Sequence, residues 1–207
     1  FKRFSLSHSY RSSYTLNSFK SNLEYDPLNN FLTDKSGNFL NEILFTNINL
    51  VEQFNPLIKL DMELKNSMRL VMELKRDRAL SLSLDNNLLT ETKGMDYSVG
   101  IGYRVKDLKF RTNVRGRQSV SSGDLNLKAD LSFRDNMTII RNLDILDNKV
   151  TAGQSIWSFK LSADYALSES FNAVFFYDHL FSEFAISTAF PQTTIRSGIT
   201  LRYNFGD

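Results

Sequence analysis

The C-terminal stretch of this chain constrains the fold more than any other feature, because apolar and polar residues alternate strictly along it. Ile199, Leu201, Tyr203 and Phe205 fall on one side of an extended segment, while Thr200 and its polar neighbours fall on the other. Alternation with a period of two predicts a β-strand that has one apolar and one polar face.

The same stretch has the order of residues found in the insertion signal of bacterial outer-membrane β-barrels. Gly198, Leu201, Tyr203 and Phe205 stand at the positions of the glycine, the apolar residue and the two terminal aromatic residues. We therefore expect an all-β fold, an antiparallel transmembrane β-barrel, and a location in the bacterial outer membrane.

Composition is compatible with such a barrel and excludes several other classes. The mean hydropathy is −0.29, and no run of eighteen apolar residues occurs, which excludes a transmembrane helix. Barrel strands alternate between lipid and lumen, so half of their residues can be polar. A soluble all-β domain with one buried apolar face stays open as an alternative. The formal net charge of +2 is too balanced for a nucleic-acid partner, and the absence of cysteine excludes disulfides and thiolate chemistry.

The pattern divides the chain into about eight strands within a single segment that covers residues 1–207. The predicted strands cover about 2–16, 42–65, 68–84, 96–106, 124–141, 154–167, 171–184 and 194–205. We expect long outer connections at about 17–41, 85–95, 142–153 and 185–193, and a long periplasmic connection at 107–123. Several of these strands are about twice as long as a bilayer requires.

Apolar residues on a strand tend to have either all even or all odd numbers, which we call their parity. This parity predicts how the second and third strands pair. Apolar residues keep even numbers through the Asn55-Pro56 interruption, so residues 42–65 form one strand, and a three-residue turn pairs Leu60 with Met72. The same register sets Phe54 opposite Arg78. The apolar band is the part of the strands that we expect to cross the membrane. Just beyond it, charged residues occupy the apolar face and mark its outer rim. There they pair with one another or hold lipopolysaccharide phosphates. These outer-rim residues are Glu52, Arg76 and Arg78.

Parity also assigns two sets of residues to the two faces of the wall. The predicted lipid-facing residues are Ile58, Leu60, Met62, Leu70, Met72, Leu125, Leu127, Leu131, Trp157, Phe159, Leu161, Ile199, Leu201 and Tyr203. The predicted lumen-facing residues are Lys128, Asp130, Arg134, Lys160, Asp164 and Arg202.

Nothing in the sequence calls for catalysis, a cofactor or a metal ion. His8 and His179 are the only histidines, the residue type that most often serves as a general base, and each lies on a predicted strand beside aromatic residues. We expect no enzymatic activity. A self-contained eight-stranded outer-membrane barrel, acting as an adhesin or a lipid-modifying enzyme, is the alternative function.

Several stretches, taken in order along the chain, carry a resemblance to one family. The main ones are FSLSHSYRS at residues 4–12, EQFNPL at 52–57, DLNLKAD at 124–130 and FRDNMT at 133–138. Together they resemble the C-terminal region of the SprA/Sov family, the outer-membrane translocon of the type 9 secretion system of Bacteroidota.

This resemblance implies a much larger barrel than eight strands can form. The chain would be the C-terminal part of the wall, and the remainder of the barrel would lie upstream of Phe1. The resemblance also implies a pore that exports folded cargo proteins, a PorV-like shuttle protein, a periplasmic plug protein, and contact with outer-membrane lipid and lipopolysaccharide. Only a many-stranded barrel leaves a lumen wide enough for a folded protein.

Overall fold

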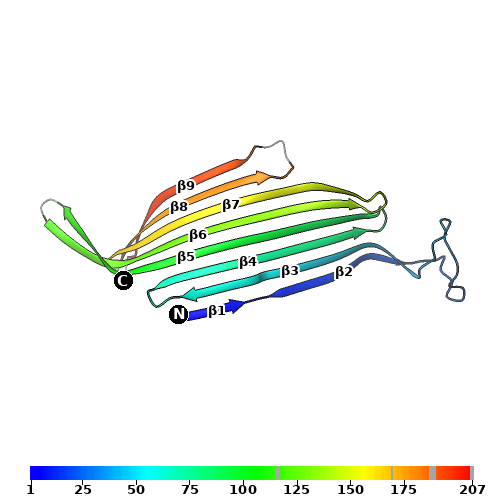
Figure 1. Ribbon diagram of the computed structural model, residues 1–207, viewed down its shortest axis with the longest axis horizontal. Helices are drawn as coiled ribbons and strands as arrows, with labels where there is room; N and C mark the ends of the chain where they lie inside the picture. Colours follow the sequence, from blue (N-terminus) through cyan, green and yellow to red (C-terminus); the bar gives the residue numbers. More distant parts are fainter. Residues whose placement is uncertain (115–116, 169, 187–189, 206–207) are drawn as a thin grey trace.

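The computed structural model describes residues 1–114, 117–168, 170–186 and 190–205, and for residues 110–114 and 117–121 it describes the backbone alone. Within these residues, nine strands form one antiparallel sheet (Figure 1). The strands are β1 (Arg3–Ser7), β2 (Tyr10–Ser21), β3 (Ile43–Glu63), β4 (Met68–Ser83), β5 (Leu88–Val114), β6 (Arg117–Asn142), β7 (Asp147–Ser168), β8 (Phe171–Phe184) and β9 (Gln192–Tyr203). The prediction of an all-β antiparallel fold is confirmed.

From β3 to β9 the strands follow their sequence order across the sheet, and each pairs with its neighbour along the chain. β1 and β2 both pair with β3, one after the other, and β9 pairs with β8 at the opposite edge. In Figure 1 the sheet is a single layer, and the two edges do not meet. Within the described residues the sheet is therefore open, and no second layer lies against either face.

The structure has nine strands where about eight were predicted, and the difference lies at the N-terminal end. The segment predicted to run from about 2 to 16 is divided between β1 and β2, and His8 and Ser9 lie between them. Opposite this break, the backbone of Ser9 bonds to Asn55 and Pro56 of β3, at N···O distances of 3.2 and 2.9 Å. Pro56 has no N–H to give to a ladder, and prolines inside sheets are typically found at such irregular places.

The predicted pairing of Leu60 with Met72 is confirmed. The pairing of Phe54 with Arg78 is wrong, because Phe54 lies opposite Arg76 and Glu52 lies opposite Arg78. The cause is an irregularity between Phe54 and Ile58, where β3 uses two more residues than β4. Two extra residues change the partner of each residue beyond that point and leave its face unchanged, because side chains alternate with a period of two.

Three connections predicted as long are short or belong to strands. β4 joins β5 through residues 84–87, and β6 joins β7 through residues 143–146. Asn87 and Leu146 have φ angles of 51° and 55°, the left-handed conformation that tight turns use. The segment predicted as a connection at 107–123 belongs largely to β5 and β6, which run on to Val114 and start from Arg117. In Figure 1 this hairpin extends beyond the ends of the neighbouring strands.

Candidate functional site

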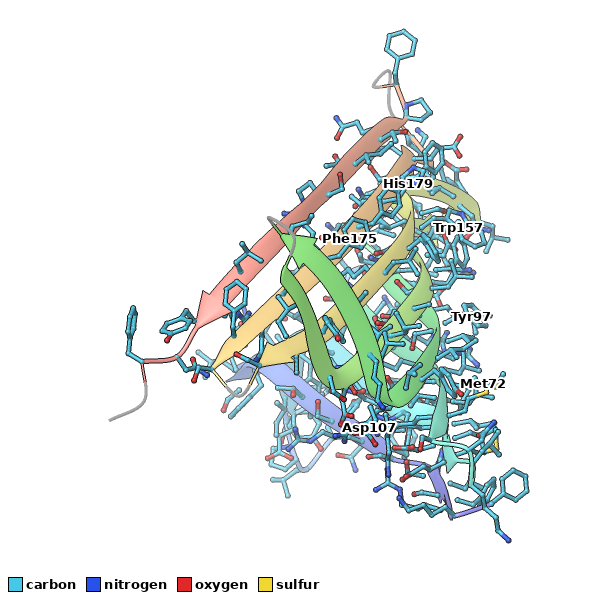
Figure 2. All side chains as sticks on the ribbon, turned by 90° about the vertical axis from the view of Figure 1, so that its left-hand side faces the viewer. Met72, Tyr97, Asp107, Trp157, Phe175 and His179 are labelled. Carbon is cyan, nitrogen blue, oxygen red and sulfur yellow. The ribbon has the colours of Figure 1, made fainter. Side chains whose placement is uncertain are left out.

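All fourteen residues predicted to face lipid lie on one face of the sheet, which we call the apolar face. Residues directly opposite each other in an antiparallel ladder share a face, so a row of pairs can be followed across the strands. One such row joins Met72 to Val99, Leu131, Phe159 and His179. Figure 2 shows Met72, Tyr97 and Trp157 pointing to the same side of the sheet.

The apolar face is uncovered. None of the described hydrophobic side chains is buried, and Leu131, Leu201 and Ile199 are 46%, 62% and 71% exposed. Soluble proteins rarely leave a contiguous apolar surface of this extent in water. The apolar face therefore requires something to cover it, whether lipid or protein.

Aromatic residues border the apolar face at two levels. Tyr97, Phe133 and Trp157 lie opposite one another on β5, β6 and β7, and their ring centroids are 6.2 and 4.4 Å apart. The second level lies near the C-terminal ends of β7 and β9, and it contains Tyr165 and Tyr203. Trp157 and Tyr165 are eight residues apart, which is about 27 Å along a strand and about 21 Å along the normal at a tilt near 40°. This spacing is close to the height of the apolar band of outer-membrane barrels, which aromatic girdles flank.

All six residues predicted to face the lumen lie on the opposite face, which we call the polar face. Cross-strand ion pairs cover much of it. Arg134 contacts Asp96 at 2.8 Å, and Arg196 contacts Asp178 at 3.2 Å. Such exposed pairs add little stability; their consequence is a hydrated surface with its charges balanced.

The residues predicted at the outer rim lie on the apolar face, beyond the aromatic row. Arg78 contacts Glu91 at 2.8 Å and Glu52 at 3.7 Å, and Arg141 also contacts Glu91. We call these four residues the rim network. Tyr10 adds a hydrogen bond by donating to Glu52 at 3.2 Å. The rim network links β3, β4, β5 and β6, and Tyr10 connects it to β2.

Glu91, the centre of this network, was not predicted from the sequence. Glu91 is only 6% exposed, and residues 85–95 were predicted as a loop. Burial acts to raise the pKa of Glu91, but hydrogen bonds from Arg141 and Arg78 outweigh it and leave the pKa below its ordinary value. Arg76, by contrast, is exposed and lies outside the network.

The residues predicted to form the C-terminal insertion signal are divided between β9 and the segment after it. Gly198, Leu201 and Tyr203 belong to β9, and the ring of Phe205 lies 4.8 Å from that of Tyr203. A side chain at Gly198 would meet the ring of Phe176 at 2.9 Å, so the glycine makes room for an aromatic ring on the polar face.

The two histidines lie in different surroundings. The Nδ1 atom of His8 is 2.6 Å from the carbonyl oxygen of Leu57, so this nitrogen donates. His179 lies on the apolar face between Phe159 and Ile195, and its ring meets Tyr177 edge to face at 6.5 Å. Among the described residues, no group of three histidine, aspartate or glutamate side chains is placed to hold a metal ion.

The fold and these surfaces define an all-β protein built on a single antiparallel sheet, with one apolar and one polar face. No family model matches the chain, and no curated protein matches it. In the part of the chain that the structure describes, no helix is long and apolar enough to cross a membrane.

Proposed function

We propose that this chain forms part of the wall of a large outer-membrane β-barrel, the translocon that exports folded cargo proteins in type 9 secretion. The observation that carries the proposal is the division of one uncovered sheet into an apolar face bordered by aromatic residues and a polar face lined by ion pairs. Barrel walls have this organisation, because one face meets hydrocarbon and the other meets water.

The two open edges favour a large barrel over a small one. In a self-contained barrel of eight or nine strands, the first and last strands pair and the sheet has no edge. Among the residues that the structure describes, β9 pairs only with β8, while β1 and β2 pair only with β3. In the proposed translocon, further strands pair with both edges, and the complete wall encloses a lumen wide enough for folded cargo.

The polar face suits the passage of folded proteins. Several of its carboxylates are held by cross-strand cations, as in the pair between Asp61 and Arg69 at 2.6 Å. An incoming protein therefore meets hydrated, balanced charge and few apolar side chains, so it has little to adhere to. The resemblance to the SprA/Sov family adds the proposed partners: secreted cargo, a PorV-like shuttle protein and a periplasmic plug protein.

The proposal is tested by the mass and composition of the native particle. Outer membranes are extracted with mild detergent, the particle that contains this chain is purified, and its polypeptides are mapped by peptide mass spectrometry. We expect a very large assembly that contains additional strand-forming sequence together with shuttle and plug proteins. A particle of about one 23.8 kDa chain would overturn the proposal and favour the small adhesin or lipid-modifying barrel.

A further inference from the structure

Two cations at the rim of the apolar face have no partner in the described part of the chain. Arg76 and Lys93 are exposed, and neither forms an ion pair or a hydrogen bond with a described residue. Lys93 lies opposite Arg78, and Arg76 lies two residues from Arg78 on the same strand, so both project from the apolar face. We call Arg76 and Lys93 the rim cation pair.

The neighbouring carboxylates are largely occupied. The rim network contains two cations and two carboxylates, so its formal charges cancel, and Glu91 already binds two guanidinium groups. Asp135 lies opposite Met95 and accepts a hydrogen bond from Ser155 at 2.8 Å. The rim cation pair therefore adds two positive charges, and Asp135 supplies only one negative charge beside them. The surroundings favour an external anion.

The rim cation pair lines a single depression at the upper edge of the apolar band. Arg76, Lys93, Met95 and Asp135 surround it, together with residues of the rim network. Arg76 lies opposite Phe54 and Met95, one ladder step from the pair of Leu74 and Tyr97. One step of two residues is about 7 Å along a strand. A ligand held here has a cationic, anion-binding site above it and an uncovered apolar surface directly below.

These positions define the chemistry of the ligand. Arginine forms paired hydrogen bonds to phosphate oxygens, and lysine adds a point charge. Free phosphate would use the cations alone, whereas a phosphorylated lipid would also place its acyl chains on the apolar face. We infer that Arg76 and Lys93 bind the phosphate group of a glycolipid of the outer leaflet. This inference rests on the proposed function, because it requires the apolar face to meet the membrane.

The test measures the phosphorylated lipid A that the native particle retains after detergent extraction, quantified by mass spectrometry per mole of this chain. The double variant Arg76→Gln/Lys93→Gln is compared with wild type. The matched control is Lys128→Gln/Arg202→Gln, which removes one lysine and one arginine from the polar face. We expect the rim variant to retain about tenfold less lipid, the factor that 1.4 kcal/mol represents, and the control to retain the wild-type amount.

Competition on the wild-type particle separates the sources of phosphate and requires no variant to fold. We expect added phosphorylated lipid A to displace the bound lipid, and dephosphorylated lipid A and inorganic phosphate to fail. Displacement by inorganic phosphate alone, or equal retention by the rim variant and wild type, would overturn the site. If the wild-type protein is absent from outer-membrane fractions, the proposed function fails instead, so the two failures are distinguishable.

Discussion

Leu161 is the position at which an added charge tests the apolar face most sharply. It lies four residues from Trp157 and four from Tyr165 on β7, and it is 36% exposed on the apolar face. Four residues are about 14 Å along the strand, or about 10 Å along the membrane normal at a tilt near 40°. Leu161 is therefore expected near the bilayer midplane, midway between the two aromatic levels.

Leu161→Arg is expected to cost roughly 2 to 4 kcal/mol of unfolding free energy, the range for arginine at the midplane on the lipid face of a barrel. In water, a substitution at such a partly exposed site would change stability by only about 0.5 kcal/mol. The matched control is Ser162→Arg, one residue along the same strand and on the polar face between Lys128 and Phe176. We expect the control to cost less than about 1 kcal/mol, because the arginine stays in water.

The assay is guanidinium unfolding of the intact protein in phospholipid vesicles, followed by tryptophan fluorescence and by resistance of the folded form to protease. The two variants are compared at the same lipid-to-protein ratio. Equal costs for Leu161→Arg and Ser162→Arg would refute the assignment of the apolar face to lipid. A larger cost for Ser162→Arg would mean that the faces are reversed.

Two further predictions concern a glycine and a buried carboxylate. Gly123→Ala is expected to prevent correct pairing at the base of the β5–β6 hairpin, because the new Cβ atom would lie 1.7 Å from the carbonyl oxygen of Ala166; Gly102→Ala, whose nearest contact is at 3.9 Å, is the tolerated control, and the yield of protease-resistant protein checks both. For Glu91, the lowered pKa means that its stabilising ion pairs are complete above the ordinary pKa near 4.5 and are lost as pH falls through the folded-state pKa. Glu91→Gln should therefore lower the melting temperature at pH 7 and reduce its decrease on acidification; an unchanged acid dependence would contradict this reasoning.

Parity explains why the faces of the sheet could be predicted from sequence. Assigning Leu131 and Lys128 to opposite faces requires only that residue numbers alternate along a strand, and this holds whatever partner each residue has. The irregularity between Phe54 and Ile58 illustrates the limit, because two extra residues on β3 preserve parity and still shift the register by two. Which residues share a face was therefore predicted correctly, while the partner of Phe54 was not; that one face meets lipid and the other the lumen stays a prediction.

The rim network could not be predicted from the sequence, because its contacts join residues that are far apart along the chain. Residues 88–95 read LLTETKGM and show no apolar alternation, so Glu91 looked like part of a polar loop. Its place on a strand becomes intelligible only when β4 and β6 bring Arg78 and Arg141 beside it. Such partners come from sequence positions 13 and 50 residues away. The edges of the sheet were equally hidden, because alternation within a strand says nothing of what pairs beside it.

The central claim, that the apolar face meets lipid and the polar face meets water, is tested most directly by labelling β7. The chain contains no cysteine, so cysteine can replace each residue from Trp157 to Tyr165 in turn and carry a nitroxide spin label in the protein as it stands in outer-membrane vesicles. We predict that labels at odd positions collide mainly with membrane-dissolved oxygen and labels at even positions mainly with a water-soluble nickel chelate. Equal access of the nickel chelate to both sets of positions would contradict the account.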